Sequence, residues 1–73
     1  MDMRGYPVVI ERMATGFSAY SPDLLGCAAA GDTGEETQQN LGEALRSHFE
    51  AMRKFGEEIP EPRTFVDYVE VAA

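Results

Sequence analysis

The stretch from Ser21 to Glu36, SPDLLGCAAAGDTGEE, divides the chain into two parts with different hydrophobic patterns. It opens on a Pro-Asp break, continues through small residues and closes on a helix start signal. Before this stretch, short runs of β-branched and aromatic residues are typical of strands. After it, apolar residues recur at the spacing of one helix face. The sequence therefore predicts a β-hairpin that leads, through a third strand, into one amphipathic helix.

Three strands are predicted before the helix. The first covers Tyr6–Arg12, and the second runs from Phe17 to Tyr20 or Ser21, after a turn that contains Gly16. The third, Gly26–Ala30, is assigned from context, because glycine, cysteine and alanine have poor strand propensity. Its small side chains indicate that another element packs closely over it. The following helix is the natural candidate.

The helix is predicted from Gly34 to Phe55. Thr33 and Glu36 form a capping box, in which the threonine side chain accepts from the backbone of the glutamate and the glutamate reaches back. Gly56 is expected to end the helix in the left-handed conformation. The apolar stripe at helical spacing consists of Leu41, Leu45, His48, Met52 and Phe55, widened by Thr37, Ala44 and Phe49.

A fourth strand, Thr64–Val71, is predicted after a stiff connector, Glu57–Arg63, in which Pro60 and Pro62 exclude a helix. The fold class is then α+β, with the two-layer order β-β-β-α-β and one helix on a small mixed sheet. A right-handed crossover places the fourth strand beside the first. Because the fourth strand is largely apolar on both faces, a second copy of the chain is expected to cover it, which predicts a homo-oligomer.

The chain of 73 residues carries a net charge of −7, from 13 acidic and 6 basic residues. This balance argues against direct binding of nucleic acid, which depends on Lys and Arg. It suits a basic protein partner, or it serves solubility alone. A single cysteine, no visible signal peptide and no stretch long enough for a membrane span predict a cytoplasmic protein with one domain over residues 1–73.

The residues whose side chains could act in catalysis or bind a metal do not form a recognisable pattern for either. A nucleophile–base pair would have to use Cys27 and His48, which are more typical of packed side chains. The acidic residues Asp32, Glu35 and Glu36 are explained more simply by helix capping than by a cation. The sequence therefore predicts an interaction module, without a cofactor and without enzyme activity.

Several segments, in this order, resemble one protein family: YPVVIE, GFSAYSPDLLGCAAAGDTGEE, NLGEALRSHFEAM and GEEIPEPR. Together they span roughly Tyr6 to Arg63 and are similar to the N-terminal domain of HicB-family antitoxins of bacterial toxin–antitoxin systems, as a short stand-alone (UPF0150-like) member. The resemblance implies a partial ribonuclease-H-like fold without catalytic residues. It also implies a partner, a HicA-type toxin, which is a small basic ribonuclease that cleaves mRNA. Longer members carry a C-terminal DNA-binding domain, which is not expected here because only about ten residues follow Arg63.

The leading hypothesis is a protein that neutralises such a toxin by steric cover and acid–base contacts. The alternatives are an orphan homo-oligomeric domain with a structural or small-ligand role, and a degenerate nuclease. The residues predicted to bind the partner are the acidic side chains of the loop and helix start and of the segment after the helix: Asp23, Asp32, Glu35, Glu36, Glu57 and Glu58.

Overall fold

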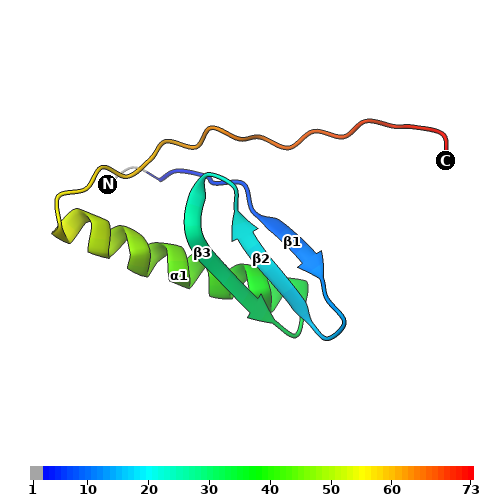
Figure 1. Ribbon diagram of the computed structural model, residues 1–73, viewed down its shortest axis with the longest axis horizontal. Coiled ribbons are helices and arrows are strands. Elements are labelled where there is room, and N and C mark those ends of the chain that lie inside the picture. Colours follow the sequence, from blue (N-terminus) through cyan, green and yellow to red (C-terminus); the bar gives the residue numbers. More distant parts are fainter. Residues whose placement is uncertain (1–2) are drawn as a thin grey trace.

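The computed structural model describes residues 3–73 and has two layers, a three-stranded sheet and one helix (Figure 1). The strands are β1 (Val9–Arg12), β2 (Phe17–Ser21) and β3 (Leu24–Gly31), and the helix is α1 (Gly34–Lys54). The sheet order is β1-β2-β3, with both pairs antiparallel. The helix packs on one face of the sheet, and its C-terminal half extends past the sheet edge. The predicted α+β class is confirmed.

Two tight turns set the register of the sheet. The β1–β2 turn closes through a hydrogen bond from the Met13 N–H to the Gly16 carbonyl (3.0 Å), and Gly16 has a φ of 75°. Pro22 and Asp23 join β2 to β3, where Ser21 pairs with Leu24. β3 begins at Leu24, which is earlier than predicted. Its pairing with β2 is irregular, because the register shifts between Tyr20 and Ser21.

The core is small and lies between β2, β3 and α1. Its buried cluster is Ala19, Cys27 and Leu41, of which Leu41 is completely inaccessible. Cys27 is therefore a packed side chain, as predicted. Around this cluster pack the partly buried Val8, Ala29 and Leu45.

The helix approaches the end of β3 very closely. A Cβ atom placed on Gly31 would lie 2.8 Å from the Thr37 Oγ1 atom and 3.0 Å from the Thr37 backbone nitrogen. Thr37 itself is fully buried and donates its hydroxyl to the Thr33 carbonyl (2.7 Å). Within the predicted strand, Cys27 and Ala29 pack toward the core. Ala28 and Ala30 are exposed, and nothing lies within 4 Å of a Cβ atom placed on Gly26. Close packing of the helix therefore accounts for the small residues on one face of β3 only.

The opposite face of the sheet is uncovered in the single chain. Ala28 and Ala30 on β3 are exposed, and in the register they lie opposite Tyr20 and Ser18. Tyr20 retains 43% of its accessible surface. Since side chains alternate along a strand, this face is the one turned away from the buried Ala19.

Both ends of α1 are capped as the sequence predicts. Thr33 has extended backbone geometry, and its Oγ1 atom accepts from the Glu36 N–H (3.0 Å). At the other end, Gly56 has a φ of 73° and donates to the Arg53 carbonyl (3.1 Å). The Glu57 N–H donates to the Met52 carbonyl (2.8 Å), which completes a Schellman motif.

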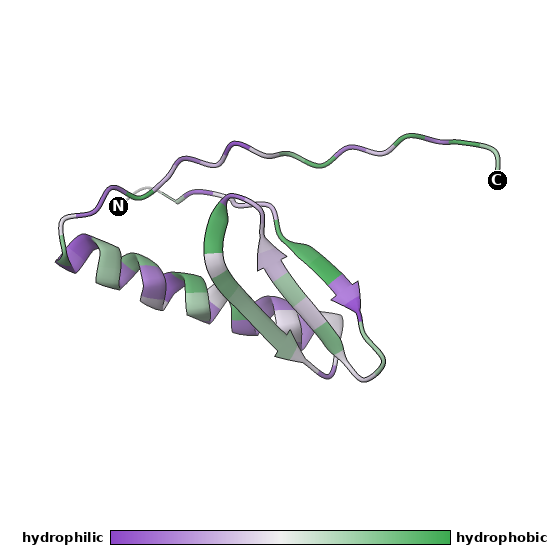
Figure 2. Cartoon of the chain, in the orientation of Figure 1, coloured by the Kyte–Doolittle hydropathy of each residue, from purple (hydrophilic) through white to green (hydrophobic). Residues whose placement is uncertain are grey.

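Polar and apolar residues alternate along α1 with the helical period (Figure 2). The predicted apolar stripe is nevertheless too long. Leu41 and Leu45 face the sheet, but His48 and Phe55 are exposed, and Phe55 keeps 76% of its surface. The C-terminal half of the helix extends past the sheet (Figure 1). There Phe49 and Met52 remain half-buried, and the Phe49 ring packs against Tyr6. No helix within residues 3–73 combines the length and apolarity needed to cross a membrane.

The predicted fourth strand is absent from the sheet of the single chain. Residues 57–73 are extended but form no ladder, and all strand pairs are antiparallel, so the expectation of a mixed sheet is wrong for this chain. The segment runs back over the end of the sheet and then away from it (Figure 1). Its path is fixed at Arg63 and Thr64 by hydrogen bonds to Asp23.

Candidate interaction surfaces

The acidic residues predicted from the sequence lie in three separate places. Asp32, Glu35 and Glu36 are exposed around the N-terminus of α1. Glu57 and Glu58 are exposed just beyond its C-terminus. A helix of 21 residues is about 30 Å long, so the two groups stand at opposite ends of α1. They are not one contiguous acidic patch.

The group at the N-terminus of α1 has the more defined geometry. The Thr33 cap fixes the first turn, and Glu35 and Glu36 occupy that turn, where the helix dipole favours negative charge. The capping box is only half formed within residues 3–73, because the Glu36 N–H is bound but the return bond from its carboxylate is not made. The carboxylates of this group remain accessible to a partner.

Asp23 makes an intramolecular contact that the sequence does not predict. Its carboxylate accepts from the Thr64 hydroxyl (2.6 Å) and from the backbone N–H groups of Arg63 (2.9 Å) and Thr64 (3.0 Å). These bonds favour the charged form, so the pKa of Asp23 is lowered, first by the Thr64 hydroxyl and then by the Arg63 N–H. Asp23 therefore holds the segment after the helix against the β2–β3 turn. We call this arrangement the Asp23 clamp.

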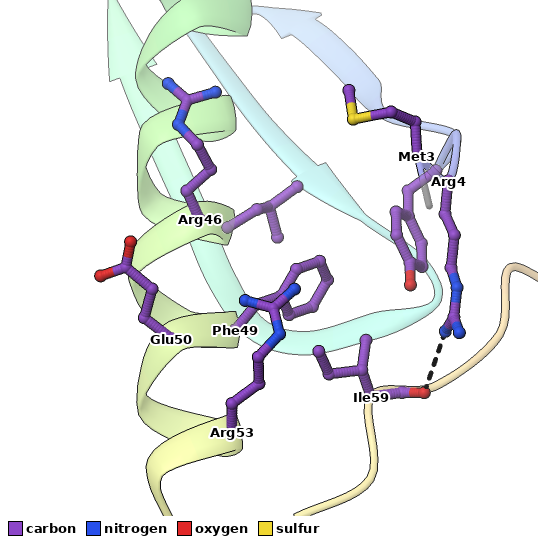
Figure 3. Close-up of a pocket in the computed structure, with 9 residues that line it drawn as sticks. Met3, Arg4, Arg46, Phe49, Glu50, Arg53 and Ile59 are labelled. Carbon is purple, nitrogen blue, oxygen red and sulfur yellow. Dashed lines mark hydrogen bonds between the residues drawn. The ribbon is translucent and has the colours of Figure 1, made fainter. Parts of the chain in front are cut away.

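A groove of about 500 Å³ lies between the C-terminal half of α1, the residues before β1 and the start of the connector (Figure 3). The Tyr6 and Phe49 rings meet on its inner side, with centroids 5.4 Å apart. The Tyr6 hydroxyl donates to the Pro60 carbonyl (2.6 Å), and Arg4 donates to the Ile59 carbonyl (3.3 Å).

Arginine side chains give this groove a cationic rim within an acidic protein. Arg46 and Arg53 extend from α1 with Glu50 between them, and Arg4 approaches from the opposite side (Figure 3). Arg4 also forms an ion pair with Glu61 (3.7 Å). The sequence analysis did not identify this groove, because its lining residues come from segments far apart in the chain. The spacing of Arg46, Glu50 and Arg53 on one helix face was the available signal.

The residues considered for catalysis lie in different environments. Cys27 is buried in the core. His48 is exposed on α1, where its ring centroid is 6.4 Å from that of Phe49. Among residues 3–73, no three His, Cys, Asp or Glu side chains are grouped so that they could hold a metal ion.

Among residues 3–73, exposed large apolar side chains are most closely spaced in the segment Thr64–Val71, which we call the tail. Its apolar side chains all keep most of their accessible surface, with the exposed fraction ranging from 60% to 87%. They are Phe65, Val66, Tyr68, Val69 and Val71. Contiguous exposed apolar residues of this kind mark interaction sites.

These features define a small two-layer α+β domain. Its acidic residues at the ends of α1 and its apolar tail are exposed to solvent. A family model described as the HicB_like antitoxin of bacterial toxin-antitoxin systems matches residues 6–72. The chain therefore belongs to the HicB-like antitoxin family, as its resemblance predicts. The match includes the tail, which is thus part of the family's domain.

Individual proteins are also similar to this chain. An uncharacterised 14.9 kDa protein of Haemophilus phage HP1 is 38% identical over 64 residues, which cover 88% of this chain and 48% of that protein. A UPF0150 protein of Synechocystis is 40% identical over 48 residues, 64% of this chain and 61% of that protein. The chain thus spans about half to three fifths of the length of these relatives.

Two solved structures share the fold at substantial sequence identity. A chain in a structure described as the HicA3 and HicB3 toxin-antitoxin complex matches with a TM-score of 0.68 and 37% identity, over 82% of this chain and 70% of that one. The antitoxin HicB3 crystal structure matches with a TM-score of 0.68 and 38% identity, over 78% of this chain and 42% of that one. The arrangement of three strands and one helix is therefore that of an antitoxin.

Proposed function

We propose that this protein is the antitoxin of a toxin–antitoxin pair and neutralises a HicA-type toxin by direct protein–protein contact. The observation that carries the proposal is its similarity, at 37% identity, to a chain of a toxin–antitoxin complex. The toxin expected from the family is a small basic ribonuclease. An acidic binding protein with a net charge of −7 has the complementary charge. On this proposal the protein acts by occlusion, without catalysis, in the cytoplasm.

The contact surface that we favour is the acidic start of α1. Asp32, Glu35 and Glu36 are exposed there on a rigid, capped turn, so their carboxylates meet a cation without an ordering cost in the backbone. Glu57 and Glu58 form a second, separate acidic site beyond the other end of α1. Asp23 contributes indirectly, through the position of the connector that it holds.

A binding experiment with the toxin encoded beside this protein tests the proposal. The full chain and the toxin are mixed, and complex formation and RNA cleavage by the toxin are measured at two salt concentrations. We expect a complex, suppressed cleavage, and weaker association at high salt because exposed charges are screened. Absence of binding at low salt contradicts the proposal.

Paired variants locate the surface. The double variant Asp32→Asn and Glu35→Gln removes two charges at the helix start and leaves the Thr33 cap intact. The matched control, Glu11→Gln and Glu43→Gln, removes two exposed charges elsewhere. We expect the first variant to associate more slowly and with a shallower salt dependence, and the control to behave as the unaltered chain. Equal behaviour of the two variants would exclude the helix start as the contact.

We also propose that the protein self-associates, because the exposed tail favours it. The same feature supports the second candidate function, an orphan homo-oligomeric domain with no toxin partner. The two are distinguished by one comparison. An oligomer that also binds and silences the toxin supports the antitoxin, whereas an oligomer that leaves toxin cleavage unchanged supports the orphan domain.

A further inference from the structure

We propose that two copies of this chain exchange their tails, so that residues Thr64–Val71 of each copy form the fourth strand beside β1 of the other copy. This inference deepens the self-association proposed above by naming the segment, the receiving edge and the contact that drives the exchange. The pattern of the tail, the state of β1 and the Asp23 clamp each contribute to it.

The tail has the composition of an internal strand. Phe65, Val69 and Val71 lie on one face of an extended chain, and Val66 and Tyr68 lie on the other. Each face carries a single acidic residue. A strand apolar on both faces requires cover on both, yet these side chains are at least 60% exposed in the single chain. The segment thus lacks the packing for which its sequence is suited.

The edge of β1 lacks a neighbour in the same structure. β1 pairs with β2 along one side only, so its outer backbone N–H and C=O groups have no strand partner within residues 3–73. Unpaired strand edges recruit further strands. Ile10, on the helix side of β1, keeps 39% of its surface, and Val9, on the other side, is only half-buried. The edge therefore offers apolar contacts on both faces of an added strand.

The Asp23 clamp fixes the point at which the tail begins. The carboxylate of Asp23 holds Arg63 and Thr64 at the β2–β3 turn, immediately before the tail begins. Upstream, the connector is attached at Pro60 by the Tyr6 hydroxyl and is stiffened by Pro60 and Pro62. From this fixed point the tail leaves the sheet, and it ends far from the body (Figure 1). A short, rigid hinge of this kind favours exchange between copies over closure within one copy.

A second copy suits the tail better than a charged partner does. Within Thr64–Val71 only Asp67 and Glu70 have acidic side chains, so the segment offers little to a basic protein and resembles the apolar core of an obligate interface. Exchange is also reciprocal, because each copy supplies one tail and one free β1 edge, and the assembly closes at two chains.

The area available is sufficient for a stable dimer. Phe65 and Tyr68 are each more than 80% exposed, and aromatic side chains bury on the order of 150 Å² or more. The total accessible area buried would exceed the roughly 1,000 Å² that a specific interface needs, because it includes both tails with their valines and the surfaces that receive them.

Sedimentation of the chain alone, without toxin, tests the exchange. The unaltered chain is compared with Val69→Asp, which places a charge in the tail, and with Ser47→Asp, which adds the same charge on an exposed turn of α1. We expect a dimer of twice 8.0 kDa for the unaltered chain and for Ser47→Asp. We expect Val69→Asp to be at least about tenfold weaker in dimerisation, with an unchanged circular dichroism spectrum.

Isotope-filtered NMR on a dimer of one labelled and one unlabelled chain then identifies the contact. Nuclear Overhauser effects between Val69 of one chain and β1 of the other support exchange. The proposal is overturned by a monomer at millimolar concentration, by a Val69→Asp dimer as stable as the unaltered one, or by tail contacts to β1 of the same chain. Because no toxin is present in these experiments, a negative result would refute the exchange of tails without bearing on toxin binding.

Discussion

Replacement of Leu41 by alanine tests how much of the stability of this domain rests on one side chain. Leu41 is completely buried, and its neighbours in the core cluster, Ala19 and Cys27, are both small. Small neighbours on a sheet cannot move far enough to fill the space that the leucine leaves. Buried Leu→Ala substitutions cost about 2–5 kcal/mol, the larger values where the cavity persists. We therefore expect a loss of about 3–4 kcal/mol in the free energy of unfolding.

That loss is comparable with the whole stability of the chain, because a single small core rarely supplies more than about 3–5 kcal/mol. Urea unfolding followed by circular dichroism measures it. With an m-value near 1 kcal/mol/M, the midpoint should fall by about 3 M, and part of the variant should be unfolded without urea. The control is Leu25→Ala, since Leu25 is 90% exposed and should change stability by less than about 0.5 kcal/mol. A loss below about 1 kcal/mol for Leu41→Ala would refute the assignment of the core.

Three further predictions concern the helix start and the Asp23 clamp. Thr33→Ala removes the N-cap and should cost about 1 kcal/mol in urea unfolding, whereas Thr33→Ser should keep nearly all of it. Gly31→Ala places a methyl group against Thr37 and should destabilise by about 1–3 kcal/mol; an unchanged midpoint would mean that the helix lies farther from β3. Because the folded pKa of Asp23 is lowered, the clamp is complete above the ordinary carboxyl pKa of about 3.9 and is lost as pH falls through the lowered value, which the Thr64 amide shift should report. Asp23→Asn should abolish that titration.

The local parts of the fold were predictable because their signals are local. The capping threonine and the glycine that ends α1 each act on neighbours within a few positions, and the structure confirms both. The end of the apolar stripe was not predictable from periodicity. His48 and Phe55 continue the pattern, but whether they are buried depends on where the sheet stops, which is a property of the tertiary structure.

The candidate site shows the same division. Charge identified the acidic residues, and the structure places Asp32, Glu35 and Glu36 together because they are close in sequence. It separates them from Glu57 and Glu58 by the length of the helix. The bonds from Asp23 to Arg63 and Thr64 join positions about forty residues apart, and no pattern in one sequence indicates such a pair.

The uncovered face of β3 has a consequence for the entropy of any association that involves it. Ala28 and Ala30 are exposed there beside the backbone of the strand, and neither has a side-chain torsion that covering would freeze. Immobilised long side chains cost up to about 2 kcal/mol each, whereas alanine costs none. Tyr20, which lies opposite Ala28 and is 43% exposed, would lose side-chain freedom when covered. Covering Ala28 and Ala30 would therefore cost no side-chain conformational entropy at these two positions. The hydrophobic free energy gained by burying them would not be reduced by such a cost.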